Sequence, residues 1–303
     1  MKLKTKDLLT LDELSPKEFV GLIDDSIKLK KELKKGNKQV LKNKTLTMIF
    51  QKPSTRTRVS FETGMFQLGG HAINLSSNDM QLSRGESIED TAKTLSRYTN
   101  CIMARVYEHE LLEKLAEHAT VPVINGLSDS FHPCQILADF MTIKEKKKKL
   151  KGLKIAWVGD GNNVCNSMIY GAALTGITMS IATPKGFEPN SKVVKEAKKS
   201  TKIELTTDPY VATKNADVIV TDTFTSIHNL DKKRMNQFLP KYQVNDKLMK
   251  NAKKDAIFMH CLPAKRNQEV TPSVIDGKQS VVWDEAENRL HTQKALLAAL
   301  IHA

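Results

Sequence analysis

Hydrophobic and polar positions follow two alternating patterns along this chain. Short apolar runs are typical of buried strands, and longer stretches with apolar residues every three or four positions are typical of amphipathic helices. We expect strands over 46–50, 71–75, 101–106, 121–124, 153–158, 178–182, 202–206, 217–221, 256–260 and 280–283. We expect helices over 16–35, 57–69, 87–99, 109–119, 134–149, 164–175, 190–200 and 286–301. Strands that alternate with helices in this way predict an α/β fold with parallel sheets.

The length of 303 residues favours two domains. We expect one domain over 1–133 and another over 151–285, each with a central parallel sheet flanked by helices. The stretch 134–150 reads as a linking helix, and the last helix, over 286–303, is expected to pack back on the first domain.

Composition narrows the functional classes. Hydrophobic residues make up 40% of the chain and charged residues 27%, which is typical of globular proteins. The sequence has no apolar stretch long enough to span a membrane, and its first residues lack the apolar core of a signal peptide, so we expect a cytoplasmic protein with no membrane partner. The formal net charge is +13, but aromatic residues are only 6% and much of the excess is lysine in helical stretches. This pattern favours attraction of small anionic substrates over nucleic-acid binding.

The four cysteines are widely spaced and form no C-x-x-C pair. A disulfide framework or a closed zinc site is therefore not predicted. The cysteines are Cys101, Cys134, Cys165 and Cys261.

The segment Ser54-Thr55-Arg56-Thr57-Arg58 lies between an expected strand and an expected helix. Backbone N–H groups at a helix start have no partner within the helix, and the helix dipole favours an anion there. Arg56 and Arg58 add guanidinium groups, which are always charged and can donate two parallel hydrogen bonds to phosphate oxygens. The segment therefore predicts a phosphate site, although an isolated motif of this kind is also typical of a plain helix cap.

Two further turns follow expected strands. His132 stands before a helix-opening proline, with Gln135 one turn further on, so both side chains are expected at the rim of a sheet. The turn Gly159-Asp160-Gly161-Asn162-Asn163 begins like a dinucleotide fingerprint, but Val164 stands where the third glycine belongs. A NAD site is thus disfavoured, and Asn163 becomes a candidate for binding a polar substrate group.

The later strands end on other polar groups. Asp222 follows one expected strand with Ser226 four residues on, and Cys261 follows another beside a Leu262-Pro263 bond. The carboxyl ends of strands are where open α/β sheets bind ligands. Arg289 adds a cation near the start of the last helix.

Together these motifs resemble the aspartate/ornithine carbamoyltransferase family over nearly the whole chain. The motifs in order are STRTR-x-S-F-E-T-G, the loop D-M-Q-L-S-R-G-E-S, ARVY, INGLSD-x-x-HP-x-Q-x-L-x-D, GDGNN, TD-x-x-x-S, HCLP and AENR. The motifs HCLP, DGNN and TD-x-x-x-S resemble those of the ornithine branch of the family. The aspartate branch carries a P-L-P run in place of HCLP.

The resemblance implies a carbamoyl phosphate-binding first domain, an ornithine-binding second domain, and homotrimers, or multiples of trimers, with shared active sites. The implied reaction transfers the carbamoyl group of carbamoyl phosphate to the δ-amine of L-ornithine, giving L-citrulline and phosphate. It implies neither a metal nor an organic cofactor, because charge neutralisation alone activates the leaving phosphate. The same residues serve arginine synthesis and arginine breakdown, so the resemblance implies no direction.

The family's functional residues match positions of this sequence. Carbamoyl phosphate binding is implied for Ser54, Thr55, Arg56, Thr57, Gln81, Arg105, His132, Gln135, Cys261, Leu262 and Arg289. Ornithine binding is implied for Asn163, Asp222, Ser226 and Ile227. Catalytic roles are implied for Arg105, His132, Asp222, Cys261 and Arg289.

The resemblance also implies particular arrangements. Gln81 would reach into the neighbouring subunit's site, Cys261 would pair with Asp222 to orient the δ-amine, and the Leu262-Pro263 bond would be cis.

Two positions depart from the family pattern. Ser226 is followed by Ile227-His228, where Met-Gly is usual, and Ser83 replaces a loop glycine. The first departure concerns amine selectivity and the second concerns the loop.

Two alternatives follow from the sequence. One is a sister transcarbamylase acting on putrescine or N-acetylornithine. We favour ornithine because the sequence stops soon after AENRLHTQKALLAAL, without the additional helix associated with the putrescine enzymes, and because Asp222 predicts a site for a free α-amino acid. The other is a nucleotide-binding or nucleic-acid-binding α/β protein, which would leave STRTR, HPCQ and HCLP unexplained.

Overall fold

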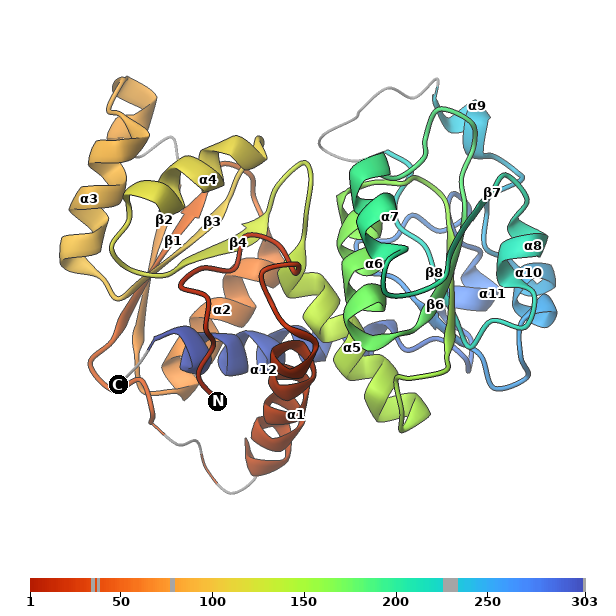
Figure 1. Ribbon diagram of the computed structural model, residues 1–303, viewed down its shortest axis with the longest axis horizontal. Helices are drawn as coiled ribbons and strands as arrows, with labels where there is room; N and C mark the ends of the chain where they lie inside the picture. The colour runs from red at the N-terminus through yellow and green to blue at the C-terminus, as the bar shows by residue number, and fades with distance from the viewer. Residues whose placement is uncertain (34–35, 37–38, 77–79, 226–233, 302–303) are drawn as a thin grey trace. The chain divides into compact units, whose positions relative to one another are not determined.

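The computed structural model describes residues 1–33, 36, 39–76, 80–225 and 234–301 (Figure 1). The chain divides into two compact units. Unit 1 comprises Met1–Met141 and Glu287–Ala303, and unit 2 comprises Thr142–Ala286. The division falls inside one long helix, α5 (Pro133–Lys147).

Unit 1 is built on a parallel sheet with the strand order β2-β1-β3-β4. Because β2 and β3 lie on opposite sides of β1, the order reverses at β1, and ligands of open α/β sheets bind where it does so. In register, Phe50 at the end of β1 pairs with Arg105 at the end of β3. The strands are β1 (Thr45–Phe50), β2 (His71–Ser76), β3 (Cys101–Arg105) and β4 (Val123–Leu127).

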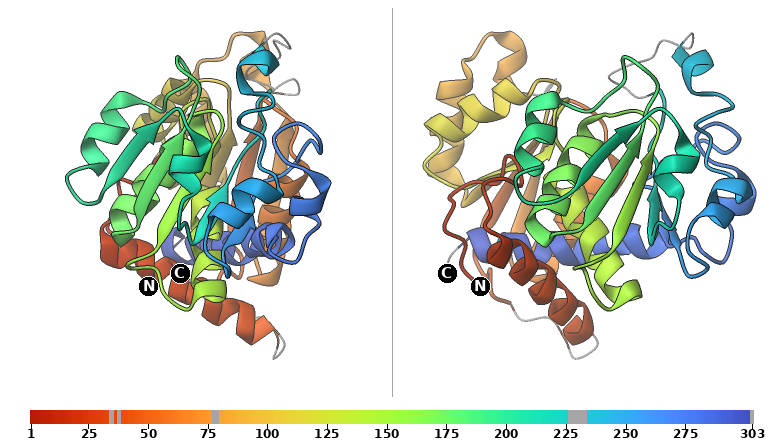
Figure 2. Two further views of the ribbon diagram at one scale, coloured as in Figure 1. Left: turned by 90° about the vertical axis from the view of Figure 1, so that its right-hand side faces the viewer. Right: turned by 45° about the vertical axis from the view of Figure 1, so that its right-hand side comes forward.

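Helices cover both faces of this sheet, with α3 and α4 on one face and α2 and α12 on the other (Figures 1 and 2). Leu112 and Leu115 of α4 pack with Ile102 and Ala104 of β3 in one buried cluster. The helices are α1 (Pro16–Glu32), α2 (Thr55–Gln67), the 3-10 turn η3 (Gln81–Arg84), α3 (Ile88–Tyr98), α4 (His109–His118) and α12 (Val282–Leu300), of which 287–300 belong to unit 1.

Unit 2 repeats this plan with the parallel order β7-β6-β5-β8-β9, which reverses at β5. Trp157 of β5 is fully buried, and Phe258 of β9 packs against Val274 and Ile275 of α11. The strands are β5 (Lys154–Val158), β6 (Thr178–Ala182), β7 (Ile203–Thr206), β8 (Val218–Val220) and β9 (Ile257–Met259). The helices are α6 (Asn163–Thr175), α7 (Ser191–Ala197), α8 (Pro209–Thr213), α9 (Met235–Phe238), α10 (Asp246–Asn251) and α11 (Pro272–Ile275).

The predicted fold class is confirmed: each unit has a parallel sheet flanked by helices, and the C-terminal helix packs in unit 1. The predicted strand over 280–283 is wrong. Ser280 makes a single bridge to Phe258, and α12 begins at Val282 because the acidic residues that follow favour a helix start. The sequence prediction also missed α8, α9, α10 and α11, which are too short to show a helical period.

Within the described residues, no helix has both the length and the apolar content needed to cross a membrane.

Candidate functional site

The start of α2 in unit 1 carries the STRTR segment. Ser54 is the N-cap residue, and its Oγ accepts a hydrogen bond from the Thr57 N–H at 3.3 Å. Thr57 is buried, Ser54 and Arg56 are half-buried, and Thr55 is exposed. The first N–H groups of α2 and the Arg56 side chain therefore lie at the sheet edge where the strand order reverses.

Arg289 of α12 joins α2 to α5. Its Nη2 donates to Thr57 Oγ1 at 3.2 Å, and its Nη1 donates to Gln135 Oε1 at 2.7 Å. Gln135 Nε2 donates in turn to Asp139 Oδ1 at 2.8 Å, which fixes the orientation of the amide. Arg289 is 3% exposed, so this positive charge is withdrawn from water and its field is little screened.

His132 lies immediately before α5 and is 4% exposed. Burial, followed by the positive charges of Arg289, Arg105 and Arg56, lowers the pKa of His132 well below its usual value. The imidazole is therefore neutral at physiological pH and offers one N–H donor. The structure thus brings together His132, Gln135 and three of the predicted arginines in one unit.

Two further buried or partly buried residues of unit 1 were missed by the sequence prediction. Lys52 is 1% exposed and its Nζ lies 4.0 Å from the centroid of the Tyr107 ring. Burial, and then repulsion from Arg105, lowers the pKa of Lys52 to about 8. His109 was also missed; its ring Nδ1 lies 2.9 Å from Ser128 Oγ in the turn that leads to His132. Neither residue belongs to a motif that would have marked it.

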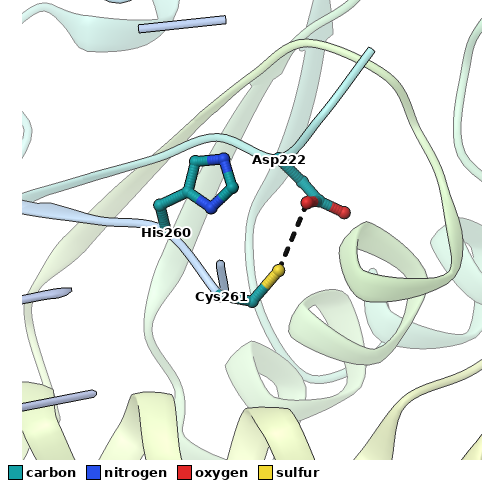
Figure 3. A group of neighbouring side chains, drawn as sticks. All are labelled: Asp222, His260 and Cys261. Carbon is teal, nitrogen blue, oxygen red and sulfur yellow. Dashed lines mark hydrogen bonds between the residues drawn. The ribbon is translucent and has the colours of Figure 1, made fainter. Parts of the chain in front are cut away.

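In unit 2, Asp222 follows β8 and is 7% exposed. Its Oδ1 accepts from the Thr223 N–H at 2.7 Å and from the Cys261 thiol at 3.2 Å (Figure 3). Its Oδ2 accepts from Asn162 Nδ2 at 2.7 Å. The expected contact between Cys261 and Asp222 is therefore present.

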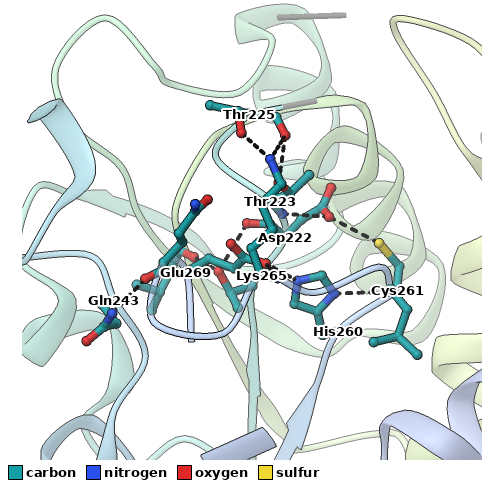
Figure 4. Close-up of polar contacts among 12 residues, drawn as sticks. Asp222, Thr223, Thr225, Gln243, His260, Cys261, Lys265 and Glu269 are labelled. Carbon is teal, nitrogen blue, oxygen red and sulfur yellow. Dashed lines mark hydrogen bonds and ion pairs between the residues drawn. The ribbon is translucent and has the colours of Figure 1, made fainter. Parts of the chain in front are cut away.

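The HCLP loop is held by a buried histidine. His260 Nε2 lies 3.1 Å from Glu269 Oε1, and both side chains are fully buried (Figure 4). His260 Nδ1 accepts from the Leu262 N–H at 2.9 Å, so the ring proton belongs on Nε2, facing Glu269. The Leu262-Pro263 bond is cis, as predicted. His260 and Glu269 therefore fix the backbone around Cys261.

The remaining predicted residues are placed as follows. Asn163 is the first residue of α6, is 8% exposed, and its Oδ1 accepts from the Val164 N–H at 3.0 Å. Gln81 is exposed at the start of η3. Ser226 and Ile227 lie outside the described residues.

Three potential metal ligands cluster in unit 2, with ligand atoms of Asp222, His260 and Cys261 within 4.8 Å of one another (Figure 3). The thiol already donates to Asp222, and the two His260 nitrogens already contact Leu262 and Glu269. A cation would have to displace these hydrogen bonds, so the arrangement fits an organic amine better than a resident metal.

Comparison with protein families gives two matches that together span most of the chain. Residues 6–145 match the aspartate/ornithine carbamoyltransferase carbamoyl-P binding domain. Residues 151–300 match the Asp/Orn binding domain of the same family.

Individual relatives agree. A protein named ornithine carbamoyltransferase from Cenarchaeum symbiosum is 63% identical over 300 residues, covering 99% of both chains. One of the same name from Methanosarcina acetivorans is 52% identical over 300 residues, covering 98% of this chain and 99% of that protein.

Solved structures of ornithine carbamoyltransferases have the same fold. The Pyrococcus furiosus structure has a TM-score of 0.94 and 52% identity, covering 97% of this chain and 96% of that one. The Thermus thermophilus structure has a TM-score of 0.91 and 43% identity, covering 98% and 99%.

Proposed function

This chain belongs to the aspartate/ornithine carbamoyltransferase family, and we propose as its function the transfer of the carbamoyl group from carbamoyl phosphate to the δ-amine of L-ornithine. The products are L-citrulline and phosphate. The observation that carries this assignment is the 63% identity, over 99% of the chain, to a protein named ornithine carbamoyltransferase. Putrescine and N-acetylornithine are not favoured as acceptors.

Carbamoyl phosphate binds in unit 1. Its phosphate accepts hydrogen bonds from the start of α2, through Ser54, Thr55, Arg56 and Thr57, with Arg105 contributing a further charge. The support is the helix N-terminus itself, together with the arginines whose charges lower the pKa of His132.

The carbamoyl group lies next to the phosphate. The neutral imidazole of His132 donates to the carbonyl oxygen, together with Thr57 and Arg105. Gln135 Oε1 accepts from the carbamoyl amide; a carbonyl oxygen has two lone pairs, so it can keep its contact with Arg289. Arg289 completes the phosphate and carbonyl end.

Ornithine binds in unit 2. Asp222, Asn163 and Ser226 hold the α-ammonium and α-carboxylate, Ile227 also contributes to ornithine binding, and Cys261 orients the δ-amine. The support for this half is the buried Asp222 carboxylate, which faces the Cys261 thiol.

The reaction needs charge neutralisation and orientation from the protein. The neutral δ-amine attacks the carbonyl carbon, the C–O bond to phosphate breaks, and the amine proton is lost to solvent or to the leaving phosphate. Fixed donors around His132 stabilise the developing oxyanion, and one such donor is worth about 3–4 kcal/mol in other enzymes.

The active assembly is a homotrimer, or a multiple of trimers, in which Gln81 completes the site of a neighbouring subunit. Val59 and Phe66 support an interface, because they are 55% and 81% exposed and their i, i+7 spacing places them on one face of α2. A cytoplasmic location also remains a prediction.

The test is citrulline formation by the purified protein with carbamoyl phosphate and, in separate reactions, ornithine, putrescine or N-acetylornithine. We expect a carbamoylated product only in the reaction that contains ornithine as the acceptor. Product with putrescine in place of ornithine would move the chain to the sister activity, and no heat on titration with carbamoyl phosphate would reject the whole assignment.

A further inference from the structure

The Asn162 side chain is hydrogen bonded at both ends of its amide. Its Oδ1 accepts from the Val164 and Cys165 N–H groups at 3.0 and 3.1 Å and so caps α6. Its Nδ2 donates to Asp222 Oδ2 at 2.7 Å. Because the two backbone donors need an oxygen, the helix start fixes the orientation of the amide, and the NH₂ group has to face Asp222.

The turn that carries Asn162 is itself held in place. Asp160 Oδ2 accepts from Arg234 Nη2 at 2.6 Å, and its backbone oxygen accepts from Trp157 Nε1 at 2.9 Å. A Cβ at Gly161 would lie 2.3 Å from the Pro189 nitrogen, so the backbone there is closely packed. Asn162 therefore projects from a fixed turn.

This contact restrains the carboxylate that faces Cys261. Rotation of an aspartate carboxylate about χ2 is broad and costs little by itself. Thr223 and Cys261 both donate to Oδ1 of Asp222 (Figure 4). Asn162 donates to Oδ2, so the three donors together define one orientation of the carboxylate. Without Asn162, the two oxygens can move away from the Cys261 thiol.

We infer that Asn162 is a positioning residue for the acceptor-amine site, acting through Asp222 rather than by touching substrate. This inference rests on the proposed function, since Asp222 is placed there as an ornithine ligand. It assigns a role to the first asparagine of the GDGNN turn, beside the role proposed for Asn163.

Two substitutions keep the helix cap and change the contact with Asp222. Serine and aspartate cap helices about as well as asparagine does. In Asn162→Ser the short hydroxyl caps α6 but cannot also reach Asp222. In Asn162→Asp one carboxylate oxygen caps α6 and the other faces Asp222. Asn245→Ser is the matched control, because Asn245 caps α10 in the same way, accepting from the Lys247 and Leu248 N–H groups at 3.0 and 3.2 Å.

For Asn162→Ser we expect the KM for ornithine to rise about tenfold, because one hydrogen bond to a charged group is lost. The dissociation constant of carbamoyl phosphate should be unchanged. For Asn162→Asp we expect the same defect at low pH and a larger one at high pH. Two facing carboxylates share a proton when one pKa is raised, and they repel once both are ionised. The ratio of variant to wild-type kcat/KM should therefore fall with rising pH for the Asn162→Asp variant and should not change with pH for the Asn162→Ser variant.

A second measurement needs no turnover. Cys261 is half-buried, whereas Cys101, Cys134 and Cys165 are buried, so iodoacetamide should label Cys261 first in the resting protein. In the resting protein the Cys261 thiol donates to Asp222 Oδ1 at 3.2 Å, and alkylation of the sulfur has to break this contact. We expect faster labelling in Asn162→Ser than in wild type or Asn245→Ser, because the carboxylate is less restrained.

The outcomes are distinguishable. If wild type makes no citrulline from ornithine, the proposed function fails. If wild type does so, and Asn162→Ser matches wild type in both ornithine KM and labelling rate, the role of Asn162 is refuted. If Asn162→Ser and Asn245→Ser raise the ornithine KM equally, the effect comes from helix capping and the role of Asn162 toward Asp222 is refuted. If the Asn162→Ser variant does not fold, the Asn162→Asp variant provides the test by itself. A ratio of variant to wild-type kcat/KM that does not depend on pH would then overturn the inference.

Discussion

Arg289 donates from Nη1 to Gln135 Oε1 at 2.7 Å, although 154 residues separate the two in the sequence. The same guanidinium contacts Thr57, so one buried charge links α12, α5 and α2 within unit 1. The C-terminal helix therefore completes a site whose other parts come from the N-terminal half of the chain.

Arg289→Lys should weaken carbamoyl phosphate binding. Lysine carries the charge but cannot contact Thr57 and Gln135 with a planar fork. We expect a loss of about 2 kcal/mol, or some thirtyfold in dissociation constant, measured by calorimetry, together with a lower melting temperature. An unchanged dissociation constant would remove Arg289 from the binding site.

Arg56→Ala should abolish most of the carbamoyl phosphate affinity, while Arg58→Ala should leave it nearly intact. Arg56 is half-buried and its charge reaches His132. Arg58 is exposed and contacts Glu62 at 3.6 Å, an exposed pair worth about 0–1 kcal/mol. Calorimetry on both variants checks this, and equal losses would mean that only net charge matters.

Cys261→Ser should impair the use of ornithine while carbamoyl phosphate binding is retained. Serine keeps a donor toward Asp222, but its oxygen is smaller and its bonds are shorter, so the δ-amine is less well oriented. We expect an increase in ornithine KM of about tenfold. Steady-state kinetics with each substrate varied in turn provides the measurement, and the opposite pattern would place Cys261 at the phosphate end.

Activity should rise toward alkaline pH. The attacking δ-amine has a lysine-like pKa, so its neutral fraction grows about tenfold per pH unit near neutrality. Burial and three arginines keep the pKa of His132 well below its usual value, so His132 is not the group that titrates. Initial rates from about pH 6 to about pH 9 at subsaturating ornithine test this, and a flat profile would contradict it.

Glu13→Gln should stabilise the protein above about pH 7. Burial raises the pKa of Glu13 from 4.5 to about 7 while its Oε2 accepts from the Leu9 N–H. Between those values the folded state holds a proton that the unfolded state has lost, so Glu13 costs stability as pH rises.

The glutamine side chain in Glu13→Gln still accepts from the Leu9 N–H but does not ionise. We therefore expect the free energy of unfolding to increase by about 1–2 kcal/mol at high pH, allowing for the partial exposure of this side chain. Urea unfolding at about pH 8 and about pH 4.5 makes the comparison, and the two proteins should converge at the lower value. A gain of equal size at both pH values would point to packing instead.

The alternation of strands and helices followed from the sequence because periodicity is a local property. The roles proposed for STRTR, His132 and HCLP came from the family resemblance of these motifs. The same local pattern misled the prediction at 280–283, where a short apolar run extends into the first residues of α12. It also gave no sign of Lys52, His109 or Glu269, whose contacts with Tyr107, Ser128 and His260 depend on the tertiary structure.

The sequence by itself determined the fold class and the family, and it predicted most of the polar and charged residues of the candidate site. Only the tertiary structure decided which of them meet: Arg289 with Thr57 and Gln135, and Asn162 with Asp222. These pairings depend on strand order and on where each helix docks. Both are set by long-range packing of the two sheets' cores, which no single stretch of sequence records.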